Sequence, residues 1–219
     1  MERCQEYLTE LLEEVGMKIE AASIEDNEET CQLLNISTEK PSREEAKEAM
    51  KHMRNNKSPG ADEITAKIWK ADTVSTMELL IPLIEDIWTN EEISKGWNDE
   101  ITVKLPKKGS IKECMNWRGV ILLTANKILA HIVNQRIKQK IDNTQEQAGF
   151  RRSYRNDRMV FVDFEKAFDR INHGAMWKIL KQKGIPEKMI NLIKMMYSNA
   201  TCQVEHKGYI TNQIKIKKG

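Results

Sequence analysis

A short apolar stretch that ends in acidic residues has the composition and spacing for metal chemistry. Residues 160–169 read Val-Phe-Val-Asp-Phe-Glu-Lys-Ala-Phe-Asp, so the apolar run stops at Asp163, and Phe168 and Asp169 follow closely. Such a run favours a buried strand. A carboxylate at its end needs a partner or a metal, and Mg²⁺ prefers carboxylates. The stretch is therefore either half of a phosphoryl-transfer metal site or a strand end whose Asp caps the next helix.

Three further segments could contact phosphate. Lys104-Leu-Pro-Lys-Lys-Gly109 places lysines at the tip of an expected hairpin, and Arg118 precedes an apolar strand from which its guanidinium could bind phosphate. The turn at 57–62, Lys-Ser-Pro-Gly-Ala-Asp, offers backbone amides. Each also has a structural interpretation: solvated lysines, an Arg stacked on Trp117, and a helix stop followed by an Asp cap.

Charge is divided unevenly along the 219 residues, although the net charge is only +2. Residues 1–50 carry 14 acidic and 5 basic residues, whereas residues 101–155 carry 12 basic and 3 acidic ones. A basic middle region suits a polyanion such as nucleic acid or nucleotide phosphate. Ordinary solvated Lys and Arg would give the same composition.

The cysteines and histidines are scattered, and no Cys-x-x-Cys pair is present. A disulfide framework or zinc site is therefore not expected, and a reducing compartment fits best. We expect the four histidines to be surface or hydrogen-bonded residues rather than ligands. They are His52, His131, His173 and His206. Without a signal core or a membrane-length apolar run, the expectation is an intracellular protein of nucleus or cytoplasm with no membrane partner.

Periodicity predicts helices first and a mixture of strands and helices afterwards. Ser42 and Glu45 form a capping-box pattern that predicts a helix start, and residues 21–40 are typical of a loop or linker. The expected helices are near 1–20, 42–55, 62–71, 73–94, 126–141, 174–183 and 186–198. The expected strands are 101–105, 119–124 and 160–164, and alternation at 201–206 and 213–217 predicts a hairpin. This order predicts an α+β fold.

Taken in order, the motifs resemble those of a known protein family, although none of them is specific alone. A Pro-Gly loop, a Lys hairpin, Asn116-Trp-Arg, Gln147-Ala-Gly-Phe150 and the Asp163 segment follow one another. Gly184-Ile-Pro-Glu-Lys188, Leu192–Tyr197 and the early segment 3–12 add to them. In this order they resemble the reverse transcriptase of LINE-like, non-LTR retrotransposons over nearly the whole chain.

The resemblance implies a right-hand polymerase fold and roles for particular residues. Asp163 corresponds to the first catalytic carboxylate, which ligates Mg²⁺ in a two-metal displacement. Phe164 corresponds to a backbone position beside the metal or phosphate, and Phe168 to the ring that crowds a ribose 2′-OH. Lys107, Lys108 and Arg118 correspond to finger residues that hold the triphosphate. The implied partners are an RNA template, a DNA primer and deoxynucleoside triphosphates.

Three departures from the family pattern suggest a truncated copy. A Tyr-Ala-Asp-Asp type box, which supplies the remaining carboxylates, is missing, as are endonuclease and thumb regions. Only residues 151–159 bridge Gln-Ala-Gly-Phe and the Asp163 strand, where the family has a helical segment. The Pro-Gly loop reads Ser-Pro-Gly-Ala-Asp-Glu, whereas the family more often has Pro before the Asp and Gly after it.

These observations predict an acidic helical N-terminal segment and linker over 1–40, followed by a partial reverse transcriptase domain over 41–219. The fingers would span 41–150 and an incomplete palm 151–219. One carboxylate cannot hold two Mg²⁺ ions, so we expect the chain alone to be inactive. The alternatives are a non-catalytic nucleic-acid-binding or helical interaction remnant, or a chain that never folds stably.

Overall fold

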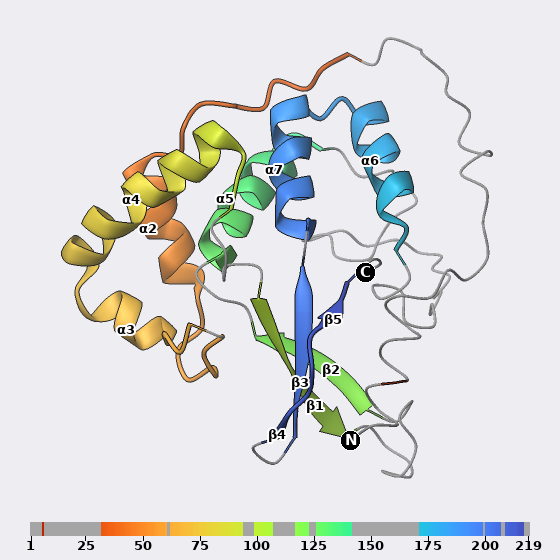
Figure 1. Cartoon of the computed structure of the whole chain (residues 1–219). Coiled ribbons are helices and arrows are strands. Elements are labelled where there is room, and N and C mark those ends of the chain that lie inside the picture. Colours follow the sequence, from red (N-terminus) through yellow and green to blue (C-terminus); the bar gives the residue numbers. More distant parts are fainter. Residues whose placement is uncertain are drawn as a thin grey trace, which may run out of the picture.

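The computed structural model of the chain describes residue 6 and residues 32–60, 62–93, 99–106, 117–122, 126–141, 171–198, 200–206 and 209–216. Helices and strands are labelled as in Figure 1. The expected helix near 1–20 and the expected strand at 160–164 lie outside the described residues, apart from the helical residue 6.

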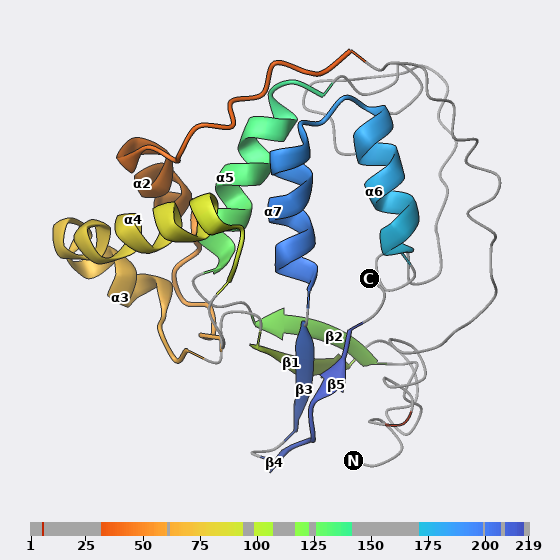
Figure 2. The same ribbon diagram turned by 45° about the horizontal axis from the view of Figure 1, so that its top comes forward.

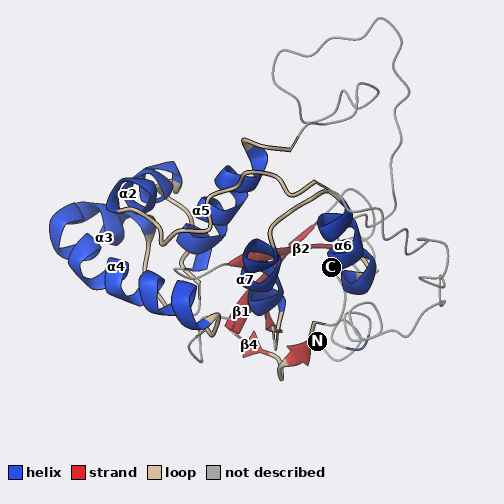
Figure 3. Cartoon of the chain, turned by 90° about the horizontal axis from the view of Figure 1, so that it is seen from above, coloured by secondary structure: helices blue, strands red, loops and turns tan. Residues whose placement is uncertain are grey.

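Six described helices form the larger part of the fold. They are α2 (Arg43–His52), α3 (Ala66–Ala71), α4 (Thr73–Asn90), α5 (Asn126–Lys138), α6 (His173–Gln182) and α7 (Glu187–Tyr197). Each lies within or close to a helix predicted from the sequence, so these predictions are confirmed. α2, α3 and α4 lie together on one side of the molecule, and α6 lies on the other (Figure 1, Figure 3).

Local signals in the sequence set where several of these helices begin. The Ser42 hydroxyl accepts from the Glu45 amide at 3.1 Å, and the Glu45 carboxylate accepts from the Ser42 amide at 2.8 Å, which completes the predicted capping box of α2. Asp72 caps α4 by accepting from the amides of Val74 and Ser75. Each cap satisfies amides that have no partner within their own helix.

The hydrophobic core lies where α2, α4, α5 and α7 meet. α5 packs against both α2 and α7, and Figure 2 shows α5 and α7 side by side. The largest fully buried side chains come from all four helices and from the turn before α7. They are Trp88, Met50, Met77, Leu80, Ile84, Ile87, Ile128, Leu129, Ile132, Ile185, Met189 and Leu192. They follow the helical spacing seen in the sequence, because one face of each helix is turned towards its neighbours.

A sheet of five described strands lies below α5 and α7 in Figure 1. β1 (Asp99–Pro106) and β2 (Trp117–Leu122) form the predicted antiparallel hairpin, with Val103 opposite Val120. β3 (Thr201–His206) pairs with β4 (Tyr209–Ile210) and with β5 (Ile214–Lys215), as expected for a terminal hairpin.

The sheet also contains a parallel pair that the sequence pattern does not predict. β1 pairs with β3, with Asp99 opposite Thr201 and Val103 opposite Glu205. This pairing joins the hairpin expected in the fingers to a hairpin expected in the palm. The two segments therefore belong to one continuous sheet.

The segment 32–41 contains no helix or strand, yet it is packed against the helices. Leu34 donates its amide to the carbonyl of Gly184 at 2.8 Å, and the Trp88 indole donates to the carbonyl of Thr38 at 2.9 Å. Gly184 has φ 74°, and a Cβ there would lie 2.4 Å from the Gln32 carbonyl oxygen. The segment 32–41 is therefore hydrogen-bonded both to α4 and to the turn between α6 and α7. No described helix has the length and apolar composition needed to cross a membrane.

Candidate functional site

Of the six site residues predicted from the sequence, the structure describes the backbone of one. Arg118 lies in β2, opposite Leu105 of β1, and the neighbouring pair is Pro106 and Trp117. These two pairs lie at the end of the described hairpin, and the next two residues of the sequence after Pro106 are Lys107 and Lys108. The other predicted site residues lie outside the described residues: Lys107, Lys108, Asp163, Phe164 and Phe168.

The start of α6 bears on the alternative role considered for the acidic segment. The N-cap of α6 is Asn172, whose side-chain oxygen accepts from the Ala175 amide at 2.9 Å. The alternative in which an Asp of the acidic segment caps a helix concerns residues outside the described ones, so it stays a prediction.

A second basic region surrounds the predicted turn at 57–62. A pocket of about 210 Å³ lies between the end of α2, this loop, α3 and the start of α5. Three cationic side chains, Arg54, Lys57 and Lys127, line it together with Trp69. The basic turn suggested such a site, but Arg54, Trp69 and Lys127 come from other elements and could not be assigned to it from the sequence.

Asp62 interacts both with the charge of Lys127 and with the backbone of the turn. Burial lowers the pKa of Lys127, and the nearby carboxylate of Asp62 opposes this shift. Asp62 also accepts from the Ile64 amide at 3.2 Å, and Glu63 between them has φ 56°. A left-handed backbone at this position favours Gly. The structure thus gives a physical reason why Gly would be favoured at position 63.

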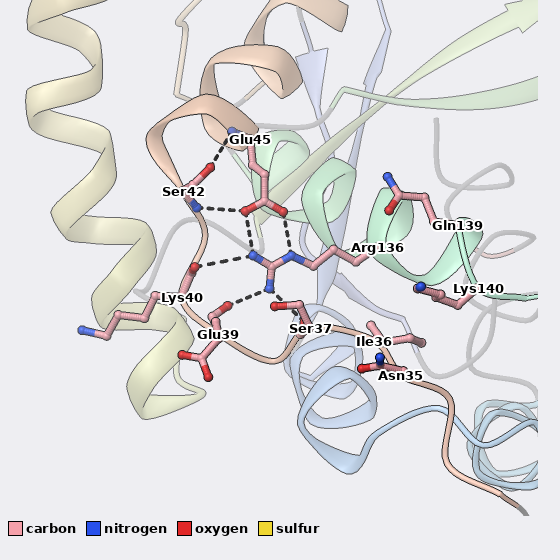
Figure 4. Close-up of a pocket in the computed structure, with 10 residues that line it drawn as sticks. All are labelled: Asn35, Ile36, Ser37, Glu39, Lys40, Ser42, Glu45, Arg136, Gln139 and Lys140. Atoms are coloured by element: carbon pink, nitrogen blue, oxygen red, sulfur yellow. Dashed lines mark hydrogen bonds and ion pairs between the residues drawn. The ribbon is translucent and has the colours of Figure 1, made fainter.

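A second, more open concavity of about 500 Å³ has the most extensive described polar network at its floor (Figure 4). The Arg136 side chain is 9% exposed and donates to the Glu45 carboxylate at 2.7 and 2.6 Å. It also donates to the carbonyls of Ser37 and Glu39, and it lies 4.9 Å from the Trp88 ring centroid. The hydrogen bond to Arg136 is the main reason that the pKa of Glu45 is lowered.

The Arg136 network is structural rather than a ligand site. Its guanidinium donors are directed at Glu45 and at backbone carbonyls, so they are already occupied within the protein. The network fixes the segment 32–41 against α2 and α5. It therefore stabilises the helical part of the fold at the start of α2.

No candidate site for the catalytic metal ions is found among the residues that the structure describes. Within that part of the chain, no three side chains of His, Cys, Asp or Glu are placed to hold a metal ion. The segment with Asp163 is not among them, so this finding does not bear on the predicted carboxylate. The sequence contains no Asp-Asp dipeptide.

Comparison with known proteins identifies related sequences. The family described as "Reverse transcriptase (RNA-dependent DNA polymerase)" matches residues 105–218. The chain is 24% identical over 199 residues to the "Transposon TX1 uncharacterized 149 kDa protein" of Xenopus laevis. This match covers 80% of this chain and 15% of that protein.

A second relative comes from an insect. Over 184 residues the chain is 24% identical to the "Retrovirus-related Pol polyprotein from type-1 retrotransposable element R2" of Popillia japonica. This match covers 74% of this chain and 25% of that protein. The chain thus spans a quarter or less of the length of either relative.

Proposed function

Because the chain belongs to the reverse transcriptase (RNA-dependent DNA polymerase) family and its relatives are non-LTR retrotransposon proteins, we propose that it is part of a retrotransposon polymerase domain that binds a primed RNA template. The observation that carries this proposal is the family match over 105–218, which includes the end of β1, all of β2 and the segment around Asp163. The reaction class is RNA-directed DNA synthesis.

The β1–β2 hairpin is the proposed contact with the incoming nucleotide. Arg118 pairs with Leu105 near the end of the hairpin, and Lys107 and Lys108 directly follow Pro106 of β1 in the sequence. Cations at this end would neutralise the triphosphate as charge develops on the leaving pyrophosphate. Phe168 would exclude a ribose 2′-OH, and Phe164 would lie beside the bound phosphate.

The basic pocket is the proposed contact with a nucleic-acid backbone. Arg54, Lys57 and Lys127 lie around one cavity, and α5 begins four residues after β2 ends. Because Arg118 stands at the start of β2, the pocket adjoins the opposite end of the hairpin, and it would be a contact separate from that with the triphosphate. Trp69 in its lining provides an apolar surface beside the three cations.

The expected metal cofactor is a pair of Mg²⁺ ions, which would stabilise the attacking and leaving oxygens of the nucleotidyl transfer. The donor set in this chain does not fit a complete pair. Asp163 is the single carboxylate assigned to the site, and no Asp-Asp dipeptide occurs in the 219 residues. We therefore expect the 219-residue chain to bind nucleic acid but not to extend a primer.

A salt-titrated binding assay tests this proposal. The measured quantity is the affinity of the 219-residue chain for a fluorescent RNA template annealed to a DNA primer, from 50 to about 300 mM salt. Each lost phosphate contact reduces the slope of log K against log salt by about one. Lys107→Ala/Lys108→Ala should weaken binding and flatten this slope, whereas Asp163→Ala should leave both nearly unchanged.

Two outcomes would reject parts of the proposal. Absence of binding, or binding that does not depend on salt, would reject a nucleic-acid role. Binding that ignores the lysine substitutions would reject the hairpin as the contact surface. Lys181→Ala, on α6, serves as a control for the general loss of positive charge.

A further inference from the structure

The loop between α2 and α3 presents a serine to solvent directly before a proline. Ser58 is exposed, and residues 54–60 contain no helix or strand. Each of the other four prolines follows a residue without a side-chain hydroxyl, so Ser58-Pro59 is the single Ser-Pro or Thr-Pro step in the 219 residues. Because a proline disfavours helical backbone in the residue before it, Pro59 biases Ser58 towards an extended conformation.

The surroundings of Ser58 are those that a protein kinase requires of a substrate. Residues 54–58 are all exposed, so an enzyme can reach this side of the loop. A kinase holds its substrate as an extended segment and accepts the proton of the hydroxyl that attacks the nucleotide. One class of serine/threonine kinases acts on serines that precede a proline. Exposure, backbone preference and sequence therefore all suit phosphorylation at Ser58.

Ser58 is also part of the lining of the basic pocket. The same cavity of about 210 Å³ is lined by the cationic side chains of Arg54, Lys57 and Lys127. Arg54 and Lys57 precede Ser58 by a few residues, whereas Lys127 belongs to the first turn of α5. A group attached to the Ser58 hydroxyl would therefore lie beside cations from two distant parts of the chain.

A phosphate at this position would meet the positive charge of the pocket. Phosphoserine carries a charge of about −1.5 to −2 at pH 7 and three strong acceptor oxygens. Arg and Lys donate to such oxygens in charge-assisted hydrogen bonds, which are roughly twice as strong as neutral ones. Burial lowers the pKa of Lys127 and Asp62 opposes this shift, so a second anion nearby would further favour the charged lysine.

We propose that Ser58 is a phosphorylation site whose phosphate occupies the basic pocket and excludes nucleic-acid phosphates from it. A kinase that acts on Ser-Pro steps would transfer the γ-phosphoryl group of Mg²⁺-bound ATP to the Ser58 oxygen. The bond from the γ-phosphorus to the bridging oxygen breaks, ADP leaves, and the hydroxyl proton passes to the base of the kinase. The regulatory role rests on the proposed function, because it requires that the pocket binds a nucleic-acid backbone.

Treatment of the 219-residue chain with a purified Ser-Pro-directed kinase and Mg²⁺-ATP tests the modification. Mass spectrometry should find one phosphate per chain, on Ser58, and Ser58→Ala should take up none. Phosphorylation should raise the thermal midpoint by about 2–4 °C, because the new ion pairs form only in the folded state. In Arg54→Ala this rise should be smaller. Lys67→Ala is the matched control, since Lys67 is exposed on α3 but does not line the pocket, and the rise should persist.

The effect on binding is measured with the primed template and the salt titration described above. Phosphorylation should weaken binding about tenfold or more at 100 mM salt and reduce the salt slope by about two to three, because up to three phosphate contacts are lost. Kinase treatment should leave the affinity of Ser58→Ala where it was before treatment. Ser58→Glu adds a single charge and should weaken binding less than the phosphate does.

Gln32→Glu is the control for the added negative charge. Gln32 is exposed and lies beside Gly184, in the turn between α6 and α7, which is well away from α3 (Figure 1). Its substitution should leave the affinity and the salt slope nearly unchanged.

Three results would overturn the inference. They are the absence of phosphate on Ser58 after kinase treatment, a midpoint that does not rise or that rises equally in Arg54→Ala, and an affinity that phosphorylation leaves unchanged. Absence of template binding by the unmodified chain would instead reject the proposed function, and the regulatory role with it. In that case the midpoint shift would still decide whether the phosphate enters the pocket.

Discussion

Arg136 and Glu45 are joined by two hydrogen bonds, from Nε at 2.7 Å and from Nη2 at 2.6 Å, although 91 residues separate them in the sequence. Glu45 is also the residue that closes the capping box of α2. The same guanidinium holds the carbonyls of Ser37 and Glu39. One side chain of α5 therefore fixes both the start of α2 and the segment that leads into it.

Arg136→Ala should lower the free energy of unfolding by about 3 kcal/mol, the lower end of what loss of one partner in a buried ion pair costs. The lower end applies because the Glu45 side chain is 35% exposed. Urea-induced unfolding measures this loss. Lys40→Ala is the control, since it removes an exposed pair with Glu85 and should cost less than about 1 kcal/mol. Equal losses for the two variants would contradict the assigned role of Arg136.

Glu63→Gly should stabilise the protein. Glu63 has φ 56°, a conformation that costs a non-glycine residue roughly 1–2 kcal/mol, and Gly removes this cost while losing more chain entropy on folding. The net gain should be about 1 kcal/mol, measured as a higher midpoint of urea unfolding at an unchanged slope. Asn56→Gly is the matched control, because Asn56 also has positive φ but Asn tolerates it. A Glu63→Gly variant that is less stable than the unmodified chain would contradict this account.

Gly184→Ala should be strongly destabilising, by roughly 2–4 kcal/mol. The new Cβ would combine an unfavourable φ of 74° with a 2.4 Å approach to the Gln32 carbonyl oxygen. The segment 32–41 would have to leave the turn between α6 and α7, and faster proteolysis near residue 34 would report this displacement. Gly174→Ala is the control, since its closest contact is 3.2 Å to the side-chain oxygen of Asn172, and stability should change by less than about 1 kcal/mol.

The lowered pKa of His131 predicts a stability that falls as the solution becomes acidic. The unfolded chain binds a proton at this residue near pH 6.5, before the folded chain does, so protonation favours unfolding. The contribution of His131 is complete above this pH and is lost as pH falls towards the pKa of the folded state. In His131→Gln, the decrease in the unfolding free energy between pH 7.5 and 5.5 should be smaller. His52→Gln should retain part of this decrease because burial, the larger cause, remains. An unchanged pH profile in His131→Gln would exclude the residue as its source.

Local signals in the sequence predicted most of the described elements. The Ser42–Glu45 pattern located the start of α2, and the alternating residues around Val103 and Val120 located a hairpin. Caps and alternating side chains act over a few residues, so they can be recognised from the sequence alone. The helices lie within or close to their predicted ranges because apolar residues at helical spacing pack into one core.

Contacts between distant segments could not be predicted in the same way. The parallel pairing of β1 with β3 depends on backbone hydrogen bonds that leave no mark on residue types. Residues 32–40 have the composition of a linker, yet a hydrogen bond to the Gly184 carbonyl and hydrogen bonds from the Arg136 guanidinium hold them in place. The sequence did not distinguish Arg136 from the other basic residues, because its partner Glu45 is 91 residues away in the chain. Most of the predicted site, including Asp163, lies outside the described residues and remains a prediction.

Primer extension tests the central claim most directly. The 219-residue chain would be mixed with a labelled DNA primer on an RNA template, deoxynucleotides and Mg²⁺ or Mn²⁺, under conditions in which it binds the primed template. We predict binding without extension, because Asp163 is the single carboxylate assigned to the two-metal site. DNA synthesis by the unmodified chain that is lost in Asp163→Asn would contradict the account.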